Sequence, residues 1–117
     1  MAVMTMPPSA AVTSMTEAEL QDNVIELAHL FRYRVAHFRP ARTAHGWATP
    51  VSADGKGFPD LVLCGRGRTI FAECKSMKGK QSSEQKEWMI AIRGARSLYF
   101  LWTPEDWVSG RIEEALR

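Results

Sequence analysis

Three residues in the middle of the chain have types and spacing suited to metal-assisted chemistry: Asp60, Glu73 and Lys75. A Mg²⁺ ion prefers oxygen ligands in an octahedron and keeps several waters, so two or three converging carboxylates form a sufficient protein cage. A lysine beside that cage can orient an attacking water or neutralise charge that develops on a phosphate. Hydrolysis of a phosphodiester needs this combination of a divalent ion, an activated water and charge neutralisation.

Two short apolar runs carry these residues and predict a β-hairpin. Residues Asp60–Cys64 read DLVLC, and residues Thr69–Lys75 read TIFAECK. The segment between them, GRGR, contains two glycines, which supply the backbone freedom of a tight turn. If the two strands pair antiparallel, the start of the first lies beside the end of the second, so Asp60 and Glu73 meet at one end of the sheet.

Alternation along the second run assigns its last residues to two faces. Lys75 follows Glu73 by two residues, so both side chains should project on one face, towards the metal. Cys74 should point into the apolar layer, which leaves its backbone carbonyl available as a further metal ligand. No base-flanked motif accompanies Cys74, so we interpret it as a packed strand residue rather than a nucleophile.

A helix is predicted before the hairpin. Thr16 and Glu19 form a capping-box pattern, and the helix that they open extends to about residue 31. Its apolar stripe, at spacings of three and four residues, comprises Leu20, Val24, Leu27, Ala28 and Phe31. Glu17 continues this stripe towards the sheet, whereas Glu19 projects away from it.

A second helix is predicted after Ser82, with Gln85 three residues later. Gln85 lies on the inward face of this helix, together with Trp88 and Met89. A buried amide without a hydrogen-bond partner is costly, so its position needs a reason. Two interpretations stay open: Gln85 only caps its helix, or it also lies near Lys75 or a water in the metal centre.

The remaining segments complete a small α/β domain. Residues Arg34–Phe38 and Ser97–Trp102 predict two further strands, and Thr103–Leu116 predicts a last helix. The order α-β-β-β-α-β-α indicates a small mixed β-sheet flanked by helices. We expect a single domain over residues 16–117 after a flexible tail of residues 1–15.

The stretch Ala41–Gly57 is predicted to be a long loop, and long loops in compact domains are often functional. Its cationic side chains and Trp47 suit a nucleic-acid backbone and a stacked base, although a solvated loop would have a similar composition. The candidate DNA-binding residues are Arg39, Arg42, His45 and Lys56, together with Lys78 and Lys80 of the basic loop that follows the hairpin.

Composition sets outer limits on the function. The chain has 117 residues and a formal net charge of +2, which permits a nucleic-acid partner without requiring one. Cys64 and Cys74 lack metal-ligand or disulfide spacing, and we interpret both as buried free thiols of a reducing compartment. No apolar run approaches the roughly 18 residues of a membrane span.

Three motifs, GFPDLVL, FAECKS and SSEQKEW, resemble the VRR-NUC family of the PD-(D/E)XK nuclease superfamily, including its small stand-alone members of phages and bacteria. The resemblance implies a restriction-endonuclease-like core and a Mg²⁺ or Mn²⁺ ion held by Asp60 and Glu73, with Lys75 assisting the water. It also implies a homodimer that cuts branched DNA, such as a four-way junction, in the cytoplasm of a bacterium or a phage-infected cell.

The family also carries a metal-binding glutamate on its first helix. Glu17 and Glu19 are both candidates, and the apolar stripe favours Glu17, although a capping or helix-dipole role stays open for either. With Gln85, the candidate catalytic set is Glu17, Asp60, Glu73, Lys75 and Gln85.

Two classes of function follow from these residues. The first is an active endonuclease, and the second is a DNA-binding or recruiting module that keeps the nuclease fold without useful turnover. The presence of Asp60, Glu73 and Lys75 together favours the first.

Overall fold

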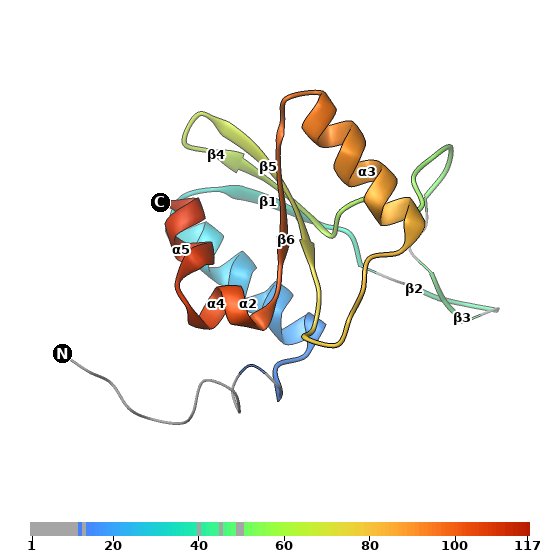
Figure 1. Cartoon of the computed structure of the whole chain (residues 1–117), viewed down its shortest axis with the longest axis horizontal. Helices are drawn as coiled ribbons and strands as arrows, with labels where there is room; N and C mark the ends of the chain where they lie inside the picture. Colours follow the sequence, from blue (N-terminus) through green and yellow to red (C-terminus); the bar gives the residue numbers. More distant parts are fainter. Residues whose placement is uncertain (1–11, 13, 40, 45, 49–50) are drawn as a thin grey trace.

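The parts of the chain that the computed structural model describes are residues 12, 14–39, 41–44, 46–48 and 51–117 (Figure 1). Most of the predicted tail, residues 1–15, therefore lies outside the described residues. No helix of the described part is long and apolar enough to cross a membrane.

The main sheet has four strands in the order β1-β4-β5-β6. Their bounds are β1 (Arg34–His37), β4 (Leu61–Gly65), β5 (Arg68–Cys74) and β6 (Leu98–Trp102). β4 pairs antiparallel with β1 and β5, whereas β6 runs parallel to β5. The predicted hairpin and the predicted mixed sheet are both confirmed.

Helices cover both faces of this sheet (Figure 1). They are α2 (Glu17–Leu30), α3 (Ser83–Gly94), α4 (Pro104–Val108) and α5 (Arg111–Leu116). α3 lies on one side of the sheet, and α2, α4 and α5 lie on the other (Figure 1). The capping boxes predicted for α2 and α3 are both present. The chain thus folds into an α/β domain of three layers.

Alternation in β5 directs its side chains to these two layers. Ile70, Ala72 and Cys74 are fully buried in the main core with the apolar stripe of α2. Phe71 lies on the opposite face, where it contacts the ring of Phe58 on the α3 side. Glu73 follows Phe71 by two residues, so its side chain lies on the same face of β5, towards α3. Cys74 points into the core, as predicted.

Two predictions about the elements are wrong. The segment Ala41–Gly57 is not a plain loop, because β2 (Ala41–Thr43) and β3 (Gly46–Ala48) form a separate two-stranded sheet within it. The last helix is not continuous, because Gly110 adopts a left-handed conformation, with φ of 84°, between α4 and α5. Three-residue strands and a single left-handed residue leave little periodic pattern in a sequence.

The prediction that both thiols are buried is wrong for Cys64. Leu61 and Leu63 of β4 are fully buried, so alternation turns Cys64 to the other face, near the end of the hairpin, where it is exposed. Cys74 alone is a buried thiol.

Candidate metal centre

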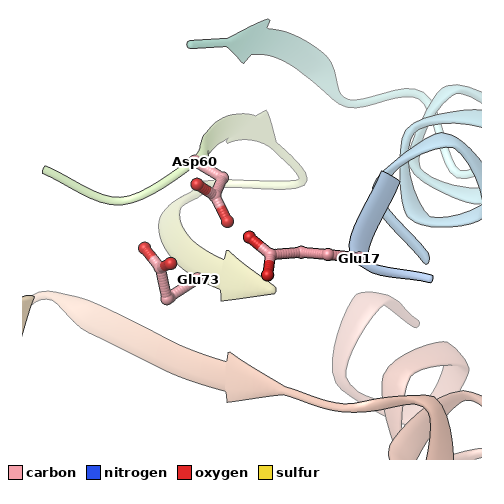
Figure 2. A group of neighbouring side chains, drawn as sticks. All are labelled: Glu17, Asp60 and Glu73. Atoms are coloured by element: carbon pink, nitrogen blue, oxygen red, sulfur yellow. The ribbon is translucent and has the colours of Figure 1, made fainter. Parts of the chain in front are cut away.

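Three carboxylates from different elements converge at one edge of the main sheet (Figure 2). Glu17 belongs to the first turn of α2, Asp60 directly precedes β4, and Glu73 lies near the end of β5. One oxygen from each side chain can be chosen so that all three lie within 4.8 Å of one another.

The register of the hairpin explains why Asp60 and Glu73 meet. Leu61 pairs with Ala72, so the residue before β4 lies beside the last two residues of β5. The backbone N–H of Cys74 donates a hydrogen bond of 2.9 Å to Asp60 Oδ2. This bond ties the Asp60 carboxylate to the end of its partner strand, as antiparallel pairing predicts.

The two glutamates at the start of α2 have different roles, because only one of them caps the helix. Glu19 Oε1 accepts a 3.1 Å hydrogen bond from the backbone N–H of Thr16, and the Thr16 hydroxyl accepts one from the Glu19 N–H. Glu19 is therefore occupied at the helix terminus and exposed. Glu17 is half-buried and faces Asp60 and Glu73 (Figure 2). The predicted apolar stripe places it there, because Leu20 and Val24 are fully buried.

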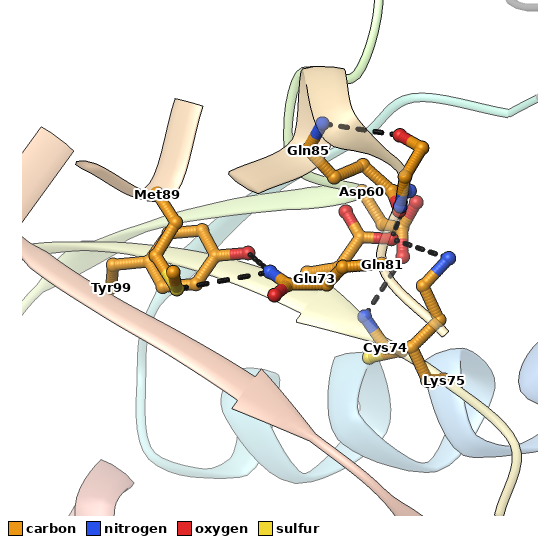
Figure 3. A network of polar contacts seen from close by, with 9 residues as sticks. Asp60, Glu73, Cys74, Lys75, Gln81, Gln85, Met89 and Tyr99 are labelled. Atoms are coloured by element: carbon orange, nitrogen blue, oxygen red, sulfur yellow. Dashed lines mark hydrogen bonds and ion pairs between the residues drawn. The ribbon is translucent and has the colours of Figure 1, made fainter. Parts of the chain in front are cut away.

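Glu73 is the most enclosed of the three carboxylates, with 1% of its surface exposed. Its Oε2 accepts a 2.8 Å hydrogen bond from Gln85 Nε2 and lies 3.5 Å from Lys75 Nζ (Figure 3). Its Oε1 is buried, and no hydrogen-bond partner for it exists among the described residues. A buried oxygen without a partner is unfavourable unless a cation or a water occupies the adjacent space.

Gln85 caps its helix and also contacts a carboxylate of the centre. Its Oε1 accepts a 2.8 Å hydrogen bond from the backbone N–H of Ser82 and completes the capping box of α3. Its Nε2 donates to Glu73 at the same time (Figure 3). The amide therefore holds the buried carboxylate from the α3 side, and its proximity to Lys75 or to a water stays a prediction.

The electrostatics of the centre favour an added positive charge. Burial and the neighbouring Asp60 carboxylate raise the pKa of Glu73 to about 8, although the ammonium of Lys75 opposes this shift. Burial also raises the pKa of Glu17. Carboxylates held together in this way resist simultaneous ionisation unless a cation compensates them.

The donor set fits a hard divalent cation. Converging carboxylate oxygens suit Mg²⁺ and Mn²⁺. Glu73 Oε1, which has no hydrogen-bond partner among the described residues, belongs to the same group of carboxylates and is free to accept a bond from an ion. Glu17, Asp60 and Glu73 would hold the ion. Cys74 lies beside them at the end of β5, and coordination by its backbone carbonyl stays a prediction.

The predicted DNA-binding residues have diverse surroundings. Arg39, Lys78 and Lys80 are exposed. Lys56 is also exposed but lines a cavity together with the acidic residues Asp54, Glu84 and Glu87 and with Trp88 and Ala91. The side chain of Arg42, which belongs to β2, and the whole of His45 lie outside the described residues.

Two further polar contacts lie near the centre: one involves Gln21, for which its position one turn after Glu17 predicts a supporting role beside the carboxylates, and the other involves Gln81, to which the sequence gives no role. Gln21 Oε1 lies 3.1 Å from Nε2 of His37, which connects α2 to β1. Gln81 Nε2 donates a 3.0 Å hydrogen bond to the hydroxyl of Tyr99 in β6, which anchors the end of the loop that carries Lys78 and Lys80 (Figure 3). The position of Gln21, one turn after Glu17, was the available signal for the first contact, whereas nothing local in the sequence links Gln81 to Tyr99.

Comparisons of the chain with protein-family models, with curated proteins and with solved structures found no match.

Proposed function

We propose that the chain is a Mg²⁺- or Mn²⁺-dependent DNA endonuclease with a restriction-endonuclease-like core. The observation that carries the proposal is the convergence of Glu17, Asp60 and Glu73 within 4.8 Å, with the ammonium of Lys75 beside them. Carboxylates in this arrangement can hold the ion that assists hydrolysis of a phosphodiester, and a neighbouring ammonium can neutralise the negative charge that develops.

Each residue of the centre has a distinct task in this proposal. Glu17, Asp60 and Glu73 would hold the ion, which would supply Lewis-acid activation when bound. Lys75 Nζ, 3.5 Å from Glu73, orients the attacking water and neutralises developing negative charge. Gln85 is a positioning residue, because its hydrogen bond fixes the rotamer of Glu73.

The resemblance to the VRR-NUC family extends the proposal to the substrate and the assembly. The motifs around Asp60, Glu73 and Gln85 are those on which the resemblance rests. We propose that the substrate is branched DNA, such as a four-way junction, cut by a homodimer in the cytoplasm of a bacterium or a phage-infected cell. Two active sites related by a two-fold axis would cut two strands of a junction symmetrically.

A direct experiment is incubation of the protein with supercoiled plasmid and with a synthetic four-way junction, in Mg²⁺, Mn²⁺ or chelator. We expect cleavage with either ion, none with chelator, and faster cleavage of the junction than of a linear duplex. DNA binding without cleavage under all conditions would favour the non-catalytic binding module. Equal cleavage of junction and linear duplex would refute the proposed preference for branched DNA.

A further inference from the structure

Glu17 is the carboxylate of the metal centre whose position depends on its helix. The backbone N–H of Cys74 holds the carboxylate of Asp60, and the amide of Gln85 holds the carboxylate of Glu73. The carboxylate of Glu17 accepts no hydrogen bond from any of the described residues. Its place beside the other two therefore depends on how α2 is seated against the sheet (Figure 2).

Apolar contacts alone do not seat α2 closely enough for a metal ligand. Its inner stripe of Leu20, Val24 and Ala28 is fully buried, but apolar contacts have no preferred direction. A metal–oxygen bond tolerates a displacement of only about 0.2 Å. The capping box of Thr16 and Glu19 joins two residues of the same helix end and makes no contact with the sheet. A directional contact between α2 and the sheet would fix Glu17 more closely.

Gln21 of α2 and His37 of β1 make such a contact. Gln21 lies one turn after Glu17 on the same face of the helix, and its Oε1 lies 3.1 Å from Nε2 of His37. An amide oxygen can only accept, so the ring nitrogen donates. Both side chains are half-buried, which limits competition from water. Among the described residues, no other side chain of α2 hydrogen-bonds a strand of the main sheet.

The strand that carries His37 is fixed to the segment that carries Asp60. His37 pairs with Leu61, and Leu61 pairs with Ala72, so the imidazole belongs to the row beside the carboxylates. The next backbone bond of the same ladder joins the N–H of Phe38 to the carbonyl of Asp60, at 2.9 Å. The Gln21–His37 contact therefore ties α2 to the end of the sheet at which Asp60 lies.

From these contacts we propose that His37 and Gln21 are positioning residues that hold Glu17 in place for the metal ion. Their hydrogen bond acts on α2 one turn from the ligand and on β1 one residue from the row of Asp60, so it sets the distance between the two elements. Residues that support metal ligands from behind typically change metal affinity by about 10- to 100-fold. The inference rests on the proposed nuclease function and deepens it, because it names two residues outside the candidate catalytic set on which ion binding depends.

The test is the Mn²⁺ affinity of the protein without DNA, measured from the electron paramagnetic resonance signal of the free ion at neutral pH. Gln21→Leu and His37→Leu each remove the hydrogen bond, and leucine favours a helix about as well as glutamine does. We expect each variant to bind Mn²⁺ about tenfold more weakly than the parent. His37→Gln keeps a side-chain N–H donor, so its affinity should return to within about threefold of the parent value.

Arg66→Ala is the matched control. Arg66 donates a hydrogen bond to the carbonyl of Phe31, which caps the other end of α2, so the substitution removes a polar contact of the same helix far from Glu17. Its Mn²⁺ affinity should stay within about twofold of the parent value. In a protein that already carries Glu17→Gln, adding Gln21→Leu should lower the affinity by no more than about twofold, because the contact acts through Glu17.

Four results have distinct meanings. Parent-like Mn²⁺ affinity in both leucine variants would overturn the positioning role, and so would a further tenfold loss on the Glu17→Gln background. A parent protein that binds no Mn²⁺ would overturn the positioning role and the ion site together. Binding of Mn²⁺ that depends on His37 and Gln21, without cleavage of any DNA, would support the positioning role and refute the nuclease function alone.

Discussion

At the scale of single residues, Glu17 and Glu19 provide an internal comparison. They stand two positions apart at the start of α2, yet Glu19 completes a capping box while Glu17 faces Asp60 and Glu73. Substitution by glutamine keeps the capping hydrogen bond at Glu19 but would replace a charged ligand of the proposed ion at Glu17. The same chemical change therefore has different consequences at the two positions.

We expect Glu17→Gln to lower the single-turnover cleavage rate by about 100-fold or more, because the ion loses a charged ligand. Glu19→Gln should keep the rate within about twofold. The measurement is cleavage of a labelled DNA at saturating protein and Mg²⁺. Loss of activity in the Glu19 variant alone would show that the apolar stripe does not identify the helix ligand.

The raised pKa of Glu73 gives a prediction for the metal-free protein. The pKa in the folded chain is about 8, above the ordinary value of 4.5, so between these values the folded chain binds more protons than the unfolded chain. Stability therefore falls as pH rises through this window. Glu73→Gln removes this contribution and keeps an oxygen that accepts the hydrogen bond from Gln85.

We expect parent and Glu73→Gln to differ little in free energy of unfolding near pH 5, and the variant to be more stable by roughly 2 to 4 kcal/mol at pH 8.5. The measurement is urea unfolding in chelator across this pH range. Parallel stability profiles for the two proteins would contradict the assigned environment of Glu73.

At the scale of elements, the centre depends on how closely the segment before β4 approaches α3. Gly57 has a φ of 84°, and a Cβ added there would lie 2.6 Å from the backbone carbon of Glu84 and 2.7 Å from the nitrogen of Gln85. A side chain at this position would therefore displace the N-terminus of α3, from which Gln85 reaches Glu73. Gly67, in the hairpin turn, also has a positive φ, of 77°, but apart from its two chain neighbours no described residue has an atom within 4 Å of its added Cβ.

Alanine substitutions at these two glycines distinguish the stability cost of backbone strain from the stability cost of steric conflict. Gly67→Ala should cost about 1 kcal/mol of stability, the cost of a left-handed alanine. Gly57→Ala should cost about 2 kcal/mol more, because the neighbouring backbone must move, and it should also slow cleavage. Urea unfolding and the cleavage rate of both variants check this. Equal losses of stability at the two positions would mean that α3 does not need the close approach.

The elements also show why part of the fold was predictable. The hairpin and both capping boxes are local features, because residues three to about fourteen positions apart create them, and the structure contains all of them. The two-stranded sheet of β2 and β3 has strands of only three residues without apolar alternation, so no periodic pattern in the sequence predicts it. The break at Gly110 depends on one residue with a positive φ. The residues on both sides of it favour a helix, so the sequence predicts one continuous helix there.

The same distinction applies to the candidate site. Asp60, Glu73 and Lys75 lie on one hairpin, so pairing and alternation were enough to bring them together. The approach of Glu17 is tertiary and was predictable only through the apolar stripe of α2. The contact of Gln81 with Tyr99 joins a loop to a strand 18 residues later, and neither residue has a local pattern that identifies the other.

At the scale of the whole molecule, the centre is the point where the layers of the fold meet. α2 contributes Glu17 from one side of the sheet, the hairpin contributes Asp60 and Glu73, and α3 contributes Gln85 from the other side. The loop with Lys78 and Lys80 follows β5 directly after Glu73 and Cys74. In the proposed function, one edge of a small domain thus combines ion binding, water activation and DNA binding.

The central claim is that these carboxylates hold an ion that drives cleavage and are not required for DNA binding. Its most direct test measures the single-turnover cleavage rate and the DNA affinity of parent, Asp60→Asn and Glu73→Gln on the same labelled junction. We predict a rate lower by about 100-fold or more in both variants, with affinity within a few-fold of the parent value. Undiminished cutting by both variants would contradict the assignment of the metal centre.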